Sequence, residues 1–321
     1  MFASDSARLG PASHRAPERL SAPRIDDPLL RAVGGTPLVP LTTLVREGGA
    51  GFELWGKLES MNPTGSVKDR PALAIVRSAL ADGSLANGRT LVDASSGNTG
   101  LAYAMLGARI GFPVRLYLPR NANPARLEAI RAFGTEVVLT DPGEGTDGAQ
   151  REARAAAEAD PARFFLADQY HNPANPRAHY TGTGPEIWQQ THGRLTHLVA
   201  GVGTGGTISG TGRFLKEQRA SIRVIGVEPT GPMHGLEGLK HLPTAVRPGT
   251  YDPAVLDETV RVETEEALQM VERLARQEGL RVGPSAGAAV VAAVQVGRSA
   301  PGAVVVAILP DSGGRHGGPD G

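Results

Sequence analysis

Short apolar segments, each followed by a small-residue loop and then an amphipathic helix, recur along this chain, and this order most constrains its fold. Residues 90–94 predict a strand, and a loop of Ser, Gly and Asn leads from it into a helix. Residues 197–200 predict a second strand, after which a glycine-rich loop again leads into a helix. Residues 303–309 are almost wholly apolar, which is typical of a strand buried on both faces. The pattern predicts an α/β fold with parallel sheets covered by helices. Further strands are predicted at 53–59, 114–118, 136–139 and 224–227.

The length and charge of the chain limit the classes of protein to which it can belong. Its 321 residues exceed what one hydrophobic core usually serves, so two lobes are expected. Thirty-three basic side chains balance 33 acidic ones, which argues against binding to nucleic acid or to a membrane surface. The chain has no cysteine, so disulfides and thiolate metal sites are excluded, and no metal site is expected. No apolar run reaches the roughly 18 residues that span a bilayer.

The first 28 residues lack the periodicity of the rest of the chain. Four prolines stand there among arginines, serines and acidic residues, so we expect residues 1–28 to form a mobile arm. The acidic side chains, Asp5 and Glu18 among them, argue against a transit peptide. The cytoplasm is the expected location.

A lysine stands in a tight, glycine-bearing loop at the start of a predicted helix, in the sequence Pro-Thr-Gly-Ser-Val-Lys-Asp-Arg at 63–70. Gly65 permits a tight backbone approach, and Pro71 is suited to a first helical turn. Taken alone, Lys68 would be an ordinary solvated surface charge. If burial or neighbouring cations free its amine near neutral pH, it can act as a nucleophile or a base.

A second loop, Gly-Thr-Gly-Gly-Thr at 203–207, lies between a predicted strand and a predicted helix. Successive backbone N–H groups at a helix N-terminus bind a phosphate dianion when the loop has no bulky side chains. The loop has neither the lysine of a nucleoside-triphosphate-binding loop nor the spacing of a dinucleotide-binding loop. Taken alone, it would be either a simple turn or a site for any nucleotide.

Four segments, in their order, resemble the set that holds pyridoxal phosphate in the cysteine synthase family, whose fold-type II enzymes are related to the tryptophan synthase β chain. The resemblance runs from about Val33 to Arg315. It implies a smaller α/β lobe at 61–173 and a larger α/β lobe at 29–60 plus 174–316, with the cofactor between them. The segments are Pro63–Arg70, Ser95–Gly100, Gly203–Thr207 and Leu309–Gly313, and Val33–Leu38 resembles the family's opening signature.

The resemblance implies a role for each matching residue. Lys68 would bond the cofactor covalently and move the Cα proton of the substrate. Ser312 would be a neutral partner for the ring nitrogen, because a hydroxyl, unlike a carboxylate, does not impose a proton there. Asn98 would bond the ring oxygen, and Gly203, Thr204, Gly205, Gly206 and Thr207 would hold the phosphate. The substrate would be bound by Ser95, Ser96, Gly97, Thr99 and Gln169.

The activity that the resemblance implies is a β-replacement, which makes L-cysteine from an activated serine (O-acetylserine or O-phosphoserine) and a sulfur donor. Two related activities stay open. A cystathionine β-synthase-like condensation of serine with homocysteine usually comes with a regulatory extension that this sequence lacks, and serine or threonine dehydratases generally have histidine where Thr99 stands. A non-enzymatic relative would normally have lost the lysine or the phosphate loop. A homodimer is also implied, with serine acetyltransferase or a sulfur-carrier protein as candidate partners.

The segment His-Gly-Leu-Glu-Gly-Leu-Lys-His at 234–241 resembles the cysteine synthase B type, which carries charged residues here and often accepts larger sulfur donors or phosphoserine. Lys240, His241 and Arg247 lie in a segment that borders the active-site mouth in the relatives. A charge-assisted contact there would favour a phosphoryl leaving group, whereas a solvated loop would not. The sequence leaves open the choice between the two activated serines and the identity of the sulfur donor.

Overall fold

A computed structural model gives the fold and describes residues 27–46, 51–95 and 97–313. Residues 1–26 of the predicted arm lie outside the described residues. Asp27 and Pro28, which the sequence analysis assigned to the arm, belong instead to the folded part. The Asp27 carboxylate caps helix α1 (Pro28–Arg31) by accepting a hydrogen bond from Leu29 N at 2.8 Å. It also forms an ion pair with Arg109.

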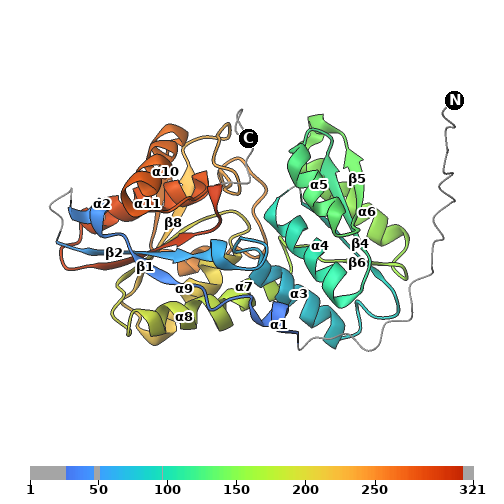
Figure 1. The fold of residues 1–321 in the computed structure, drawn as a ribbon, viewed down its shortest axis with the longest axis horizontal. Helices are drawn as coiled ribbons and strands as arrows, with labels where there is room; N and C mark the ends of the chain where they lie inside the picture. The colour runs from blue at the N-terminus through green and yellow to red at the C-terminus, as the bar shows by residue number, and fades with distance from the viewer. Residues whose placement is uncertain (1–26, 47–50, 96, 314–321) are drawn as a thin grey trace, which may run out of the picture.

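The larger sheet has six strands in the order β1-β2-β10-β7-β8-β9 and lies in the left half of the molecule in Figure 1. Neighbouring strands are parallel, except that β1 pairs antiparallel with β2 at one edge. The prediction of parallel sheets is therefore confirmed for every strand of this sheet but β1. The strands are β1 (Leu38–Pro40), β2 (Glu53–Leu58), β7 (His197–Gly201), β8 (Arg223–Pro229), β9 (Glu258–Val262) and β10 (Val304–Leu309).

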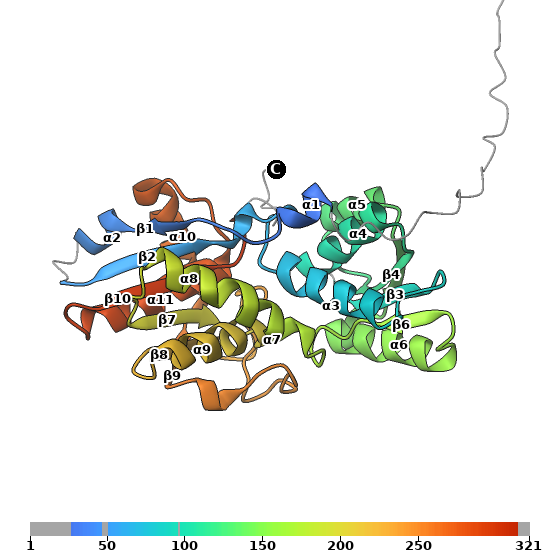
Figure 2. The same cartoon turned by 90° about the horizontal axis from the view of Figure 1, so that it is seen from below.

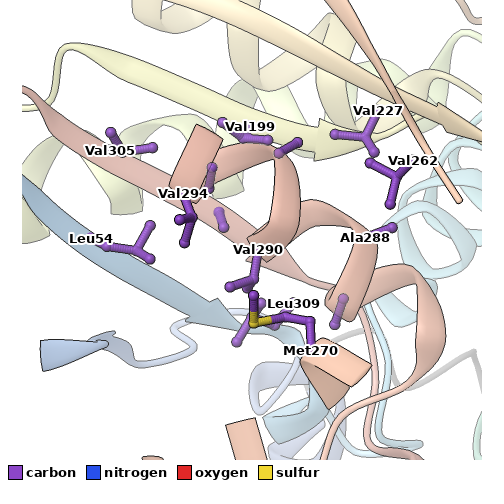
Figure 3. Close-up of a cluster of buried hydrophobic side chains, with 14 of the residues drawn as sticks. Leu54, Val199, Val227, Val262, Met270, Ala288, Val290, Val294, Val305 and Leu309 are labelled. Atoms are coloured by element: carbon purple, nitrogen blue, oxygen red, sulfur yellow. The ribbon is translucent and has the colours of Figure 1, made fainter. Parts of the chain in front are cut away.

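Strand β10 is buried along its whole length, and its side chains alternate between two helical layers. Its odd-numbered residues pack with α10 and α11, as Figure 3 shows for Val305 and Leu309. Its even-numbered residues pack with α8 and α9 on the opposite face. The prediction of a strand buried on both faces is confirmed. The helices are α8 (Gly184–Gln190), α9 (Gly206–Gln218), α10 (Thr264–Glu278) and α11 (Pro284–Arg298).

The smaller sheet has four parallel strands in the order β5-β4-β3-β6 and lies in the right half of Figure 1. One face packs with α3, α4 and α5, and the other face packs with α6. The strands are β3 (Thr90–Ala94), β4 (Val114–Pro119), β5 (Glu136–Thr140) and β6 (Phe164–Leu166). The helices are α3 (Asp69–Ala81), α4 (Asn98–Ile110), α5 (Pro124–Ala132) and α6 (Gly145–Ala159).

Short elements connect the two halves. Helix α7 (Ala174–Ala178) and a π-helical turn (His179–Thr183) lead from the smaller half back to the larger one, as Figure 2 shows for α7.

Helix α2 (Thr42–Arg46) packs against the larger sheet. Leu30 of α1 packs in the core beside the smaller sheet, although residues 29–60 were assigned to the larger lobe. The other bounds of the two lobes stay a prediction.

No helix in the described part of the chain is both long and apolar enough to cross a membrane.

Candidate active site

A pocket of about 270 Å³ is lined by loops that follow the carboxyl ends of β3, β7 and β10. Ligands of parallel α/β sheets commonly bind at this end of the strands. Most residues predicted for the site lie on its wall, whereas Gly206 and Ser312 do not, and Ser96 lies outside the described residues. The predicted residues that line it are Lys68, Ser95, Gly97, Asn98, Thr99, Gln169, Gly203, Thr204, Gly205 and Thr207.

Backbone contacts hold the loop that carries Lys68 against the end of β10. The N–H of Val67 donates to the Pro310 carbonyl oxygen at 2.8 Å, and Ser66 pairs with Asp311 in an isolated antiparallel bridge. Gly65 has φ +82°, a conformation that L side chains rarely adopt, so the turn before the lysine needs glycine. These contacts place Lys68 on the pocket wall, directly before α3.

The surroundings of Lys68 tune its protonation. Burial lowers the pKa of its amine, and the nearby Asp311 carboxylate opposes this shift. A lowered pKa increases the fraction of free amine near neutral pH, so Lys68 is suited to act as a nucleophile or a base. Asp311 is 8% exposed and accepts a hydrogen bond from Asn98 Nδ2 at 2.7 Å. One carboxylate therefore connects the lysine with the residue predicted to bond the ring oxygen.

The loop after β3 is held by its own hydroxyls and by a residue from a distant segment. The Ser95 hydroxyl oxygen accepts hydrogen bonds from Gly97 N at 3.3 Å and Gly100 N at 3.1 Å. The Thr99 hydroxyl donates to Gln169 Oε1 at 2.7 Å. The structure thus brings two predicted substrate residues into contact on the wall of the pocket. The N-terminus of α4, which follows the loop, favours an anionic group such as a carboxylate.

The glycines of the loop after β7 are required by close packing. A Cβ on Gly203 would lie 2.1 Å from the Gly238 carbonyl oxygen, and one on Gly206 would lie 2.0 Å from Asn175 Oδ1. Gly205 has φ +82°. The loop ends at the N-terminus of α9, where the first backbone N–H groups have no acceptor within the helix. Together with Lys68 in the same lining, this loop fits a cofactor that carries a phosphate and an aldehyde, as pyridoxal phosphate does.

Ser312, which was predicted to bond the ring nitrogen, does not line the pocket. Pro310 and Asp311 line the pocket after β10 ends, and Ser312 comes after the Asp311–Ser66 bridge, outside the lining. Ser285 lies in the lining instead, 4% exposed, as the second residue of α11. The sequence analysis did not single it out. Pro284 before a run of small apolar residues marks a helix start and would have indicated the position.

A buried ionic cluster next to the lysine loop also escaped the sequence analysis. The Arg70 guanidinium donates to Glu59 at 2.6 and 2.9 Å and to Glu186 at 2.7 Å. Lys57, which is fully buried, donates to Glu186 at 2.7 Å. These partners pull the pKa of Glu186 down to about 2, although burial opposes them. The cluster ties the first turn of α3 to β2 and α8, so it fixes the loop relative to the larger sheet.

Charged side chains in or beside the pocket lining come from both halves. Arg126 of α5 forms an ion pair with Glu237, which lines the pocket. The Lys240 ammonium lies 5.0 Å from the centre of the Tyr170 ring, and both residues line the pocket. His241 and Arg247, which were considered with Lys240, do not line it.

Among the residues that the structure describes, no group of three or more His, Asp or Glu side chains could hold a metal ion.

Comparison with known proteins identifies the family. A family model described as pyridoxal-phosphate dependent enzyme matches residues 29–311. The chain is 48% identical to a cysteine synthase of Aquifex aeolicus over 293 residues, 90% of each protein. It is 42% identical to cysteine synthase B of Salmonella typhimurium over 288 residues, which are 90% of this chain and 93% of that protein. A crystal structure of a cysteine synthase from Entamoeba histolytica superposes with a TM-score of 0.86 at 32% identity, covering 96% of this chain and 92% of that one. The chain therefore belongs to the cysteine synthase family of pyridoxal-phosphate-dependent enzymes.

Proposed function

We propose that the protein makes L-cysteine by β-replacement on an activated serine, with Lys68 as its central catalytic residue. The observation that carries this proposal is the position of Lys68 on the wall of a pocket that is also lined by two loops at helix N-termini. Such a pocket suits a substrate and a cofactor that each carry an anionic group. Pyridoxal phosphate, when bound, delocalises the negative charge that forms at the substrate Cα.

Lys68 moves the proton of the reaction. Its free amine removes the Cα proton, which allows the leaving group on Cβ to depart. After a sulfur nucleophile has added to Cβ, the Lys68 ammonium returns the proton to Cα. The lowered pKa supports the first of these steps, and the Asp311 carboxylate supports the second because it favours the protonated amine.

The two loops orient the reactants. We assign the substrate carboxylate to Ser95, Gly97, Thr99 and Gln169, and the cofactor phosphate to the loop 203–207. The Thr99–Gln169 hydrogen bond supports the first assignment, because it holds both polar side chains toward one region of the pocket wall. Asn98 remains the candidate for the ring oxygen. Ser96, which the sequence analysis included, lies outside the described residues.

We assign the ring nitrogen to Ser285 in place of Ser312. Ser285 is buried, lines the pocket and carries a neutral hydroxyl, so the chemical reasoning made for Ser312 applies to it unchanged. Replacing Ser285 with Ala is expected to weaken cofactor binding and slow cysteine formation, whereas Ser312→Ala leaves both close to wild type. Equal effects of the two substitutions would remove the basis for this assignment.

Replacing Lys68 with Ala tests the proposal as a whole. The variant is expected to fold and to lose both the visible absorbance of the lysine-bound cofactor and cysteine formation from O-acetylserine and sulfide. Lys216, which forms a surface ion pair with Asp257, provides the control, and Lys216→Ala should retain both signals. A Lys68→Ala protein that still makes cysteine would refute the proposal. Two assays of the wild-type protein test the alternative activities. Homocysteine in place of sulfide tests the cystathionine β-synthase-like condensation, and omission of the sulfur donor tests the dehydratase.

The position of Lys240 supports the proposal that the protein accepts O-phosphoserine beside O-acetylserine. It lines the pocket and is held over the Tyr170 ring, and a contact to a dianionic leaving group would contribute roughly 1.5–3 kcal/mol. Lys240→Met should then raise the KM for O-phosphoserine more than the KM for O-acetylserine. Arg247→Met is the matched control, because Arg247 lies outside the lining. Parallel increases for both substrates would show that Lys240 does not recognise the phosphate.

The assembly and location follow from the resemblance alone. We propose a homodimer in the cytoplasm, regulated or supplied by serine acetyltransferase or a sulfur-carrier protein. A monomer mass in light scattering at micromolar concentration would contradict the dimer.

A further inference from the structure

His179 lies between two threonine hydroxyls, one of which lines the pocket. It begins the π-helical turn and is 1% exposed. Its Nδ1 lies 2.9 Å from the Thr183 hydroxyl oxygen, and its Nε2 lies 3.2 Å from the Thr207 hydroxyl oxygen. Thr207 is the second residue of α9 and belongs to the glycine-rich loop. π-Helical turns occur frequently at functional sites. The sequence analysis did not single out this histidine.

The surroundings of His179 favour its neutral imidazole. Burial lowers its pKa well below the ordinary range, and the cationic side chains of Arg70 and Lys68 lower it further, against an opposing effect of Glu186. A neutral imidazole has one nitrogen that donates and one that accepts. Since each nitrogen faces a hydroxyl, the tautomer decides which way both hydroxyl protons point.

The two tautomers have opposite consequences for the pocket. If the proton is on Nδ1, Nε2 accepts the hydroxyl proton of Thr207, and only oxygen lone pairs are left for the pocket. If the proton is on Nε2, the ring donates to the Thr207 oxygen, and the Thr207 hydroxyl proton is left for another acceptor. An anion in the pocket favours the second arrangement, because it needs hydrogen-bond donors.

Tight packing keeps the ring in place. A Cβ on Gly210 would lie 3.0 Å from the His179 Cβ and 2.0 Å from the Pro176 carbonyl oxygen, so glycine is what allows α9 to approach the turn this closely. Thr183 is fully buried. The ring is therefore buried and lies between its two hydroxyl partners.

We propose that His179 is a positioning residue that holds its proton on Nε2 and thereby directs the Thr207 hydroxyl proton to an anionic group in the pocket. The inference rests on the proposed function in one respect, namely that this group is the phosphate of pyridoxal phosphate. His179 touches neither cofactor nor substrate in this scheme and acts only through Thr207.

Binding of pyridoxal phosphate to the apoprotein tests the proposal without reference to activity. A Gln amide can place its nitrogen where Nε2 lies, whereas the shorter Asn reaches only the position of Nδ1. His179→Gln should therefore bind with nearly wild-type affinity, and His179→Asn should bind about tenfold more weakly. Thr207→Val should lose about ten- to a hundredfold, because it removes a hydrogen bond to a charged group. The double variant that combines His179→Asn with Thr207→Val should bind pyridoxal phosphate no more weakly than Thr207→Val alone.

Thr211 provides the matched control. It is fully buried on the same helix and does not line the pocket, so Thr211→Val should keep wild-type affinity for pyridoxal phosphate. Circular dichroism confirms that each variant is folded before its affinity is compared.

Nuclear magnetic resonance of the wild-type holoprotein tests the tautomer directly. The 15N shifts of His179 should report a protonated Nε2, and the 31P shift of the bound phosphate should change in His179→Asn but not in His179→Gln. A protonated Nδ1, or additive losses in the double variant, would overturn the inference and leave the proposed function intact. A wild-type apoprotein that binds no pyridoxal phosphate would overturn both.

Discussion

Glu186 offers a test of how the buried ionic cluster supports the lysine loop. Its carboxylate accepts hydrogen bonds from Arg70 and from Lys57 at 2.7 Å, and from Gly35 N at 3.0 Å. A carboxylate whose pKa falls from 4.5 to about 2 on folding contributes about 3 kcal/mol to the free energy of unfolding above pH 4.5. Breaking a buried pair by removing one charge costs about 3–5 kcal/mol. Glu186→Gln should therefore lower the free energy of unfolding at pH 7 by about 3 kcal/mol.

Urea unfolding of the apoprotein at several pH values measures this effect. Because the pKa of Glu186 is lowered on folding, its contribution is present above pH 4.5 and is lost as the pH falls toward 2. The difference between wild type and Glu186→Gln should shrink over that range. Glu53→Gln is the control, since the Glu53–Arg194 pair is exposed and should contribute less than about 1 kcal/mol. A loss at pH 7 as small as that of the control would refute the reasoning.

Three further substitutions test the pocket. Asp311→Asn removes the charge that raises the pKa of Lys68. The Lys68 amine should therefore lose its proton at a lower pH, and the fall in kcat caused by that loss should move to lower pH in a plot of kcat against pH. Glu237→Gln breaks the ion pair between Arg126 of the smaller half and Glu237 of the pocket wall, and stopped-flow measurement should give a faster product release with the chemical step unchanged. Unchanged release rates would show that this ion pair does not retain the product. Gly205→Ala forces a side chain onto φ +82° and into contact with a neighbouring β-carbon at 2.4 Å, so the affinity for pyridoxal phosphate in a fluorescence titration should fall at least tenfold.

Local patterns were enough to predict most of the regular elements. The strand predicted at 90–94 is β3, with identical bounds, and the helix predicted after the loop that follows it is α4. The elements that were missed are short, such as β1, or bury only glycine and alanine, such as α6. Helix α11 was missed because it is buried almost all round and so has no polar face to reveal its period.

The site was predicted less evenly than the fold. Residues in contiguous motifs, such as Lys68 and the loop 203–207, could be placed in the site from the sequence. A loop between a strand and a helix lies at the carboxyl end of the strand, where ligands of parallel sheets bind. Ser285 and His179 reach the pocket region through packing that only the three-dimensional structure defines, although Pro284 marks a helix start beside Ser285. Ser312 directly follows Asp311, which bridges to Ser66 and lines the pocket, whereas Ser312 itself does not line it.

The order Lys68-Asp69-Arg70 now has a physical explanation. Asp69 is fully buried and accepts hydrogen bonds from the backbone N–H of Thr64 at 2.6 Å and from the Thr64 hydroxyl, so it closes the turn that carries the lysine. Arg70 faces the other way and binds Glu59 and Glu186 of the larger half. Asp69 is thus held by hydrogen bonds and Arg70 by ion pairs, both with partners that fix the loop, while Lys68 lines the pocket. Rigid support of this kind keeps a reactive amine in place while its protonation changes during the reaction.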